Sequence, residues 1–405
     1  MTLRDDALKL HLENHGKLAV VSKVPIKTRE DLALAYTPGV AEPCKEIKEN
    51  KDLSFEYTCR GNMVAIVSDG TRVLGLGDIG PEAAMPVMEG KAALFKTFGD
   101  VDAVPICIDT KDPAKIIETV RFLQPSFAGI NLEDISSPKC YDIECELKKI
   151  CDIPVFHDDQ HGTAIACLAA VIGALRFVKK DMKTAKFVVN GCGAAGSAIG
   201  RLLISMGAEN VTMVDRFGAL YEGIDANLDR IQSYLATVTN KEHKKGTLAD
   251  IAKGADVLIG VSAPNVFTKE IIASMADKAA LANPVPETSY ADAIEAGAAV
   301  AGTGRSDSPN QVNNVTVFPG VFRGAIDVRA KAITEEMKVA AVYAISELID
   351  EKDLRADYVV PDAFDPRVAP AVAAAVARVA METGIARIKV DPEEVRANTM
   401  KRVGR

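Results

Sequence analysis

The pattern of hydrophobic and polar residues predicts strands that alternate with helices through the first 160 residues. Short apolar runs typical of buried strands span residues 63–67, 103–108, 127–130 and 154–156. Amphipathic helical patterns lie between them, over residues 86–98, 113–123 and 139–150. Continuous apolar strands separated by helices indicate a parallel sheet that is covered on both faces.

A second alternating series follows an apolar stretch over residues 163–178, which is hydrophobic on all sides and predicts a buried helix. Its strand-like runs span residues 186–190, 211–215, 256–261, 279–282 and 298–301. This order predicts a doubly wound sheet. Further on, a stripe from Ile333 through Met337 to Leu348 predicts a helix that packs against another element.

A glycine-rich turn opens the second series and is the strongest local signal in the chain. Gly191, Gly193 and Gly196, with Ala195 between the last two, follow an apolar strand and lead into an amphipathic helix. Asp215 ends the next strand, at about the 20-residue spacing of dinucleotide-binding turns. The glycines let backbone approach a pyrophosphate, the helix N-terminus stabilises its charge, and Asp215 can accept hydrogen bonds from a ribose.

We therefore predict an α/β protein with two domains, as expected for 405 residues. Residues 1–160 form an N-terminal parallel-sheet domain, and residues 161–325 form a Rossmann-type domain that binds NAD or NADP. Residues 326–405 form C-terminal helices that pack back on the first domain. Asp215 favours NAD because it repels a 2′-phosphate, whereas Arg216 next to it could pair with that phosphate.

Two acidic pairs follow adjacent predicted strands of the first domain. Glu133-Asp134 follows the third strand and Asp158-Asp159 follows the fourth. Carboxyl ends of parallel strands meet at one edge of a sheet, so these acids converge there. Carboxylate oxygens select Mg²⁺ or Mn²⁺. The sequence does not separate the role of Asp158 from that of Asp159.

His157 and His161 stand four residues apart, as two zinc ligands on one helix face would. A zinc hydrolase is therefore a rival hypothesis for this segment. A zinc protease pattern needs Glu directly after the first histidine, and Asp158 stands there. Lys91 is a better candidate for chemistry. It falls on the apolar face of its predicted helix, where a lysine either extends to water or, beside a cation, has a lowered pKa and acts as a base.

Composition narrows the function classes. The net charge of −8 argues against nucleic acid as a partner. We find no apolar run of about 20 residues and no signal-peptide pattern, so we expect no membrane association and a cytoplasmic location. The eight cysteines form no CxxC pair, which suits a reducing compartment, and Cys140, Cys145 and Cys151 fit no zinc template.

The chain resembles the malic enzymes of the short bacterial and archaeal type, from about residue 20 to 385. The resemblance rests on motifs that occur in the family's order. They are Tyr36–Ala41, Thr71–Asp78 around Arg72, Glu89–Ala92 around Lys91, the two acidic pairs, Ala282–Pro284 around Asn283, and Asn313–Gly320 around Asn314.

This resemblance implies oxidative decarboxylation of L-malate to pyruvate and CO₂, with NAD or NADP and a divalent cation. Arg72 would bind a malate carboxylate, and Asn283 and Asn314 would orient the substrate or the carboxamide. The implied metal ligands are Glu133, Asp134 and Asp159. Lys91 would take the C2 hydroxyl proton, and Tyr36 would protonate C3.

Two alternatives remain open at this point. A malolactic-type enzyme would share nearly all of these residues but would release lactate. A catalytically idle nucleotide-binding sensor would keep the glycine turn but would have no use for Arg72, Lys91 and Tyr36. We expect a homodimer or a higher homo-oligomer.

Overall fold

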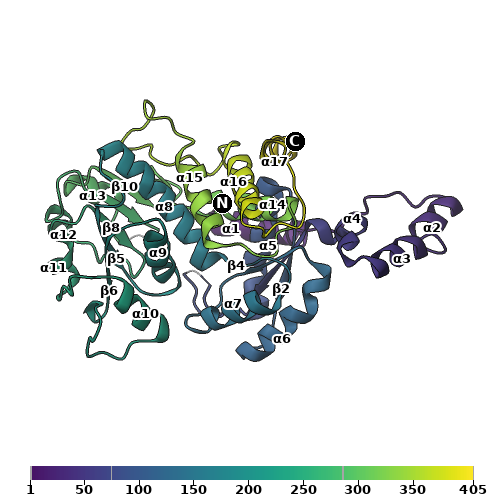
Figure 1. Cartoon of the computed structure of the whole chain (residues 1–405), viewed down its shortest axis with the longest axis horizontal. Coiled ribbons are helices and arrows are strands. Elements are labelled where there is room, and N and C mark those ends of the chain that lie inside the picture. The colour runs from purple at the N-terminus through teal and green to yellow at the C-terminus, as the bar shows by residue number, and fades with distance from the viewer. Residues whose placement is uncertain (1, 74, 285–286, 405) are drawn as a thin grey trace.

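The computed structural model describes residues 2–73, 75–284 and 287–404, and Leu74 of the arginine motif lies outside them. Figure 1 shows two sheets side by side, with helices around each and a narrow arm at one end. The strands are β1 Met63–Ser68, β2 Asp102–Cys107, β3 Gly129–Leu132, β4 Val155–His157, β5 Lys186–Asn190, β6 Asn210–Asp215, β7 Gly218–Ala219, β8 Val257–Gly260, β9 Ala280–Asn283 and β10 Val300–Thr303.

The longer helices build most of the body. In the first half of the chain they are α1 Leu3–Asn14, α2 Arg29–Ala35, α3 Ala41–Glu49, α5 Pro81–Gly99, α6 Pro113–Leu123, α7 Lys139–Ile150, α8 Asp158–Val178 and α9 Ala194–Ser205. In the second half they are α10 Arg230–Val238, α14 Phe318–Asp327, α15 Glu335–Ser346, α16 Val368–Glu382 and α17 Pro392–Val403. Four shorter helices are α4 Ser54–Tyr57, α11 Leu248–Ala252, α12 Lys269–Ala273 and α13 Tyr290–Glu295.

The first sheet has the strand order β2-β1-β3-β4, and all its pairs are parallel. Apolar side chains cover both faces: α5, α8 and α14 contribute to one core and α6 and α7 to the other. Because the strands are parallel, the loops after β1, β3 and β4 emerge at the same edge. This arrangement brings the arginine motif and both acidic pairs together.

The second sheet has the order β10-β9-β8-β5-β6-β7, and only the two-residue β7 runs antiparallel. This is the doubly wound order, with β7 where a third parallel strand commonly stands. The chain order reverses between β5 and β8, at the point where such sheets bind dinucleotides. The glycine turn lies directly after β5, at this reversal.

Helix α8 joins the two halves. It starts at Asp158 immediately after β4 and then runs through a core that includes residues of both sheets. It is the only helix among the described residues that is long and apolar enough to cross a membrane, but 83% of its most apolar window is buried inside the protein. Burial on all sides is what its sequence predicted.

The C-terminal helices return to the first sheet. Phe318 and Phe322 of α14 pack on Phe95 of α5, with ring centroids 4.5 and 5.3 Å apart. Helix α16 lies between α14 and α15, and α17 contacts α5 (Figure 1). The predicted α/β class and the two sheets are confirmed, while the limits at residues 160 and 325 stay predictions.

Several predicted boundaries differ from the structure by one or more residues, and three of the differences have a clear physical reason. Strand β3 ends at Leu132 because Asn131, a polar residue that broke the apolar run, is paired inside the protein with Glu133. Helix α5 begins at Pro81, so Pro86 stands within the helix and not at its start. Helix α8 begins at Asp158, because acidic residues are favourable in the first turn of a helix.

An N-terminal arm, residues 28–50, carries α2 and α3 and extends away from the body (Figure 1). Neither helix has a buried residue. The base of the arm is fixed, because Phe55 of α4 stacks with Arg60, Arg387 and Arg329 at 4.0, 5.5 and 5.9 Å from its ring centroid.

The contact of α8 with the loop before α16 predicts a specific stability effect. A Cβ on Gly173 would lie 1.8 Å from the carbonyl oxygen of Val359, so Gly173→Ala forces two buried backbone segments apart. We expect the free energy of unfolding to fall by about 1–3 kcal/mol or more.

Gly90→Ala in α5 is the matched control, because no atom outside its own helical turn lies within 4 Å of the new methyl group. Here we expect the free energy of unfolding to rise by about 0.5–1 kcal/mol. Thermal unfolding midpoints of both variants and the wild type measure this. Equal midpoints for the two variants would contradict the packing described.

Candidate active site

A cavity of about 380 Å³ lies between the carboxyl ends of the two sheets. It brings together residues that are far apart in the sequence. Of the predicted site residues, Arg72, Asp134, Asp159, Gly193, Ala195 and Asn314 line it. The arginine motif, the acidic pairs, the glycine turn and the second asparagine motif therefore face one space, as a single site requires.

Lys91 comes from α5, is 8% exposed and does not itself line the cavity. It contacts Asp158, which the cavity residue Asn314 also contacts. Its Nζ lies 3.0 Å from Glu133 Oε1, forms a very short ion pair with Asp158, and stands 4.1 Å from the centroid of the Phe318 ring. The lysine does not extend to water. The interpretation of Lys91 as a surface lysine is therefore wrong, and its catalytic role stays a prediction.

The ion pairs of Lys91 determine its charge state. Burial lowers the pKa of Lys91, but the ion pairs with Asp158 and Glu133 outweigh it and hold the pKa above its ordinary value. The predicted lowering of the pKa applies to the lysine beside a bound cation and stays a prediction. A positive ion at the carboxylates would act in the opposite direction.

The structure separates Asp158 from Asp159. Asp158 is fully buried, and its Oδ2 is taken up by Lys91 and the amide of Asn314. Asp159 faces the cavity, and its Oδ2 accepts hydrogen bonds from the backbone N–H of Asp134 at 2.8 Å and from His157 Nε2 at 3.1 Å. The first acid neutralises the lysine, and the second is available to a ligand.

The loops that carry the site are tied to one another. Arg72 N donates to the carbonyl oxygen of Asp134 at 3.0 Å, which fixes the arginine motif beside the acidic pair. Asp134 itself has φ of +54°, a left-handed conformation that Asp and Asn tolerate better than most residues. Strain of this kind is often found at functional positions.

The carboxylates carry more negative charge than the lysine balances. Burial, increased by repulsion from Asp159 and Asp158, raises the pKa of Glu133 to about 8. Burial and the same neighbours raise the pKa of Asp134 to about 7. Asp158 Oδ1 is buried without a hydrogen-bond partner. This all-oxygen donor set fits a hard divalent cation such as Mg²⁺ or Mn²⁺.

The fit requires a local rearrangement. Among the described residues, no group of three or more His, Cys, Asp or Glu side chains stands ready around one point. Glu133 is the residue that must move, because its two oxygens are bound to Lys91 and Asn131. Glu133, Asp134 and Asp159 as metal ligands therefore stay a prediction, supported by the donor chemistry and the charge.

A second cavity of about 600 Å³ continues from the first, and the two share Ser137 and Gly193. Gly191 has φ of +102°, and a Cβ on Gly196 would lie 1.8 Å from the Gly191 carbonyl oxygen, so both positions need glycine. Gly193 has open space around it at the start of α9. The turn leaves room for a pyrophosphate at a helix N-terminus.

Asp215 lines this second cavity and is held in place. Its Oδ2 accepts a hydrogen bond from Gln232 Nε2, and its Oδ1 accepts one from the Arg216 backbone N–H, both at 2.7 Å. Gln232 comes from α10, which carried no motif. A carboxylate at the end of β6 is placed to bind a ribose.

Two predicted site residues lie elsewhere. Tyr36 is on the N-terminal arm, 66% exposed, and does not line the cavity. Asn283 is buried at the end of β9, and its amide is used within its own loop: Oδ1 accepts from Glu287 N at 2.8 Å and Nδ2 donates to Thr288 O at 2.9 Å. Asn283 shapes the loop whose Pro284 lines the cavity, and its contact with substrate stays a prediction.

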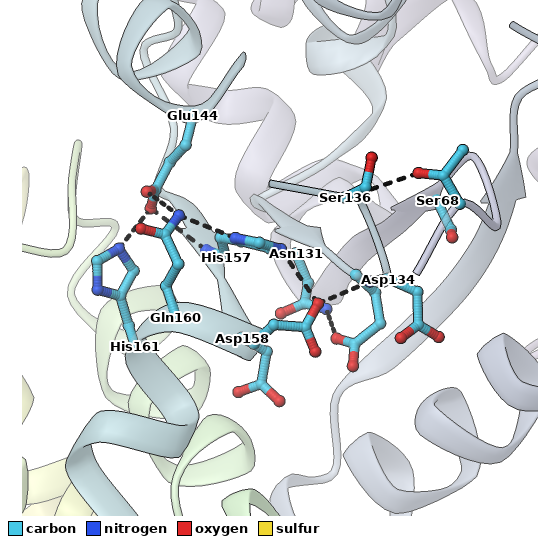
Figure 2. A network of polar contacts seen from close by, with 12 residues as sticks. Ser68, Asn131, Asp134, Ser136, Glu144, His157, Asp158, Gln160 and His161 are labelled. Carbon is cyan, nitrogen blue, oxygen red and sulfur yellow. Dashed lines mark hydrogen bonds and ion pairs between the residues drawn. The ribbon is translucent and has the colours of Figure 1, made fainter. Parts of the chain in front are cut away.

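Sequence reasoning missed a buried polar network behind the acidic pair (Figure 2). Glu144 of α7 lies at its centre, with Gln160 Nε2 at 3.0 Å and His161 Nε2 at 2.7 Å. His161 Nδ1 lies 3.0 Å from Lys338 Nζ, and His157 contacts Asp159 and Gln160. The two histidines thus have different partners, which does not match a shared zinc. The sequence did contain a signal for this network, because Glu144 and Lys338 are charged residues on the buried faces of their helices.

Comparison with known proteins shows which family the chain belongs to. The family model "Malic enzyme, N-terminal domain" matches residues 15–148, and "Malic enzyme, NAD binding domain" matches residues 160–381. The chain belongs to the malic enzyme family. The predicted resemblance, the NAD(P)-dependent oxidoreductase class and the two-domain α/β fold are confirmed.

The relatives cover nearly the whole chain. It is 57% identical to a "Bifunctional malic/malolactic enzyme" of Bacillus subtilis, over 99% of this chain and 98% of that protein. Identity is 50% to an "NAD-dependent malic enzyme" of Geobacillus stearothermophilus, with 92% and 78% covered. It is 46% to an "NADP-dependent malic enzyme" of Escherichia coli, with 95% of this chain but 53% of that protein covered. A crystal structure of malic enzyme from Pyrococcus horikoshii superposes with a TM-score of 0.96 at 45% identity, covering 100% and 96%.

The crowding of carboxylates predicts opposite responses of one variant without and with metal. Asp134→Asn keeps the size of the side chain and suits the left-handed backbone, but it removes one repelling charge. At pH 8, we expect the metal-free variant to unfold at a higher temperature than the metal-free wild type. Mn²⁺ at about 100 times its Kd should stabilise the wild type by about 2.7 kcal/mol and the variant far less.

Thermal unfolding with and without Mn²⁺ measures both effects. Asp277→Asn, an exposed position on the other domain, is the control and should respond to Mn²⁺ like the wild type. An equal Mn²⁺ response in Asp134→Asn would exclude Asp134 as a ligand.

Proposed function

We propose that this member of the malic enzyme family converts L-malate to pyruvate and CO₂ while it reduces NAD⁺ or NADP⁺. The cavity is the observation that carries the proposal. In it a cationic side chain, Arg72, faces two acids, Asp134 and Asp159, beside the glycine turn of the dinucleotide site. Arg72 would bind a dicarboxylate, the two acids would bind a divalent cation, and the glycine turn would place a nicotinamide ring beside them.

The residues divide the work as follows. Arg72 pairs with a malate carboxylate, for which its planar guanidinium offers two parallel donors. Glu133, Asp134 and Asp159 would hold a divalent cation, which would supply Lewis-acid chemistry, and the glycine turn would hold a dinucleotide, which would supply a hydride acceptor. Asn314 donates to Asp158, and in that position it also lines the cavity.

Lys91 takes the proton of the C2 hydroxyl. The lysine must first give up its own proton, and Asp158 is the acceptor in contact with it. Burial raises the pKa of Asp158, but the ion pairs also hold the pKa of Lys91 above its ordinary value. The transfer therefore requires a cation at the neighbouring carboxylates, whose charge would disfavour the protonated lysine. Lys91 and Asp158 therefore act as one acid–base pair.

Asp215 supports a preference for NAD over NADP. Gln232 and the Arg216 backbone hold its carboxylate at the ribose end of the cleft, where it would repel a 2′-phosphate. Arg216 also lines that cavity, but its guanidinium lies 4.7 Å from the Phe217 ring centroid. The preference stays a proposal, because relatives of both cofactor types are similar to this chain.

A malolactic outcome is the second candidate, since the Bacillus subtilis relative is named for both activities. The same residues would serve, with the cofactor kept in place and lactate released. The site gives no residue that separates the two outcomes. Free reduced cofactor in solution is the observable that distinguishes them. The cytoplasmic location stays a prediction.

The test is an assay of L-malate, Mn²⁺ and either NAD⁺ or NADP⁺ that reads cofactor reduction, pyruvate and lactate together. We expect equal amounts of reduced cofactor and pyruvate, with the higher kcat/KM for NAD⁺. Lys91→Ala should lower kcat by about 10²–10⁴. Lys91→Arg should be nearly as damaging, because arginine keeps the charge but does not release a proton.

Lys96→Arg, at an exposed ion pair on the same helix, is the control and should keep wild-type turnover. Lactate without free reduced cofactor would favour the malolactic candidate. Near-normal turnover by Lys91→Arg would move the base role to another group.

We further propose that the chain works as a homodimer in which Tyr36 completes the site of the partner subunit. The arm that carries Tyr36 has no buried residue, and it exposes Leu32, Leu34 and Val40 beside it. Such a hairpin does not bury enough apolar surface to be stable alone. Because the arm projects away from the two sheets in Figure 1, a second copy is the occupant that would both cover it and receive the tyrosine.

Subunit complementation tests this arrangement. Tyr36→Phe and Lys91→Ala should each be nearly inactive alone. Co-expressed, they form heterodimers in about half of the assemblies, and one of the two sites then has both residues intact. We therefore expect the co-expressed mixture to recover about a quarter of the wild-type activity, while the homodimer of each variant, purified by itself, stays inactive.

If Tyr36 served its own chain, no site in the mixture would hold both residues, and activity would not return. A monomer by sedimentation at assay concentration would equally overturn the proposal.

A further inference from the structure

A buried chain of hydrogen bonds leads from the dinucleotide domain to the acid that faces the cavity. Arg201 Nη2 of α9 donates to Gln160 Oε1 at 3.0 Å. Gln160 Nε2 lies 2.9 Å from His157 Nδ1, and His157 Nε2 lies 3.1 Å from Asp159 Oδ2. Gln160 and His157 are both 0% exposed, so no water competes for these bonds. Figure 2 shows Gln160 and His157 side by side next to Glu144.

The partners of Gln160 fix which way its amide points. Arginine has only donors, so the oxygen of Gln160 must face Arg201. On the other side stands Glu144 Oε2, at 3.0 Å from Gln160 Nε2. Burial alone would raise the pKa of Glu144, but His161 and Lys148 hold it well below the ordinary value, so it is an ionised acceptor. The amide nitrogen therefore faces Glu144 and His157.

This direction determines where His157 carries its proton. The second N–H of Gln160 points at Nδ1 at 2.9 Å, and with the amide in this direction Nδ1 is the acceptor and carries no proton. The ring proton is then on Nε2, which donates to Asp159 Oδ2. His157 is thus fixed as a hydrogen-bond donor toward the acid by a residue on its far side.

The carboxylate of Asp159 is oriented as a result. Its Oδ2 accepts from two directions, His157 Nε2 and the backbone N–H of Asp134 at 2.8 Å. Two donors on one oxygen fix the plane of the carboxylate and leave Oδ1 for a cation on the cavity side. Partners that orient a ligand in this way commonly change metal affinity by about 10–100-fold when they are lost.

We propose that His157 is a positioning residue for the metal carboxylate Asp159, and that Gln160, held by Arg201 and Glu144, sets its donor direction. This inference rests on the proposed metal-dependent function. It assigns a task to histidine and glutamine side chains that touch neither malate nor the nicotinamide.

Two substitutions of His157 test the donor position. The amide nitrogen of Gln reaches about as far as the histidine Nε2, whereas that of Asn reaches only as far as Nδ1. We expect His157→Gln to bind Mn²⁺ within about threefold of the wild type, and His157→Asn to bind about 10–100-fold more weakly. Direct Mn²⁺ titration of the full chain, followed by the electron spin resonance of free Mn²⁺, measures both without turnover. His243→Asn, at an exposed position, is the control and should leave binding unchanged.

The outcomes separate the two proposals. If the wild type itself bound no Mn²⁺, the proposed metal-dependent function would fail. If the wild type bound Mn²⁺ and the Asn and Gln variants bound it equally well or equally badly, the positioning role would fail and His157 would be structural.

A measurement on the wild type tests the donor direction even where a variant does not fold. The chain has five histidines, so selective ¹⁵N-histidine labelling gives few signals. We expect one buried histidine in contact with Gln160 to show a protonated Nε2 and an unprotonated Nδ1. Gln160→Met, which removes both bonds, should change that pattern and weaken Mn²⁺ binding.

A proton on Nδ1 of His157 in the wild type would contradict the proposed donor direction. So would a Gln160→Met variant with unchanged histidine signals and unchanged Mn²⁺ affinity.

Discussion

The crowding of four carboxylates around one lysine is the constraint on which the rest of the site depends. Glu133, Asp134, Asp158 and Asp159 meet at the carboxyl ends of two adjacent strands. Among the described residues, Lys91 is the only lysine or arginine in direct ion-pair contact with them. Burial makes each unpaired negative charge costly. This unfavourable burial of negative charge occurs where a bound divalent cation would neutralise the excess charge and where a dicarboxylic acid would bind with it.

Helix α8 connects this cluster of carboxylates to the packing of both domains. Its first turn carries Asp158 and Asp159, and its remaining length is packed between the two sheets. The acids therefore sit on a rigid element whose position is set by both domains. Arg201 on α9, the helix that opens the dinucleotide site, reaches the same region through Gln160. The proposed metal site and the dinucleotide site therefore share one packed framework.

The arm shows the opposite design. A pair of short helices without buried residues projects from an anchored base, and it carries the tyrosine of a family motif. An element of this kind gains little stability from its own chain, so its order and its chemistry both depend on another surface. The single chain thus holds a nearly complete acid–base and binding apparatus, with one proposed proton donor outside it.

The sequence by itself determined the α/β class, the glycine turn with Asp215, the acidic pairs at strand ends and the anomalous position of Lys91. These features are local, or follow from the rule that parallel strands end at one edge. Only the tertiary structure decided that Asp158 neutralises Lys91 while Asp159 faces the cavity, that Lys91 is held in its charged form, and that Asn283 is used within its loop. Each of these depends on side-chain partners brought from distant elements such as α5, α7 and α9. Neighbouring residues with the same chemistry are distinguished by direction and burial, which periodicity and spacing along the chain do not encode.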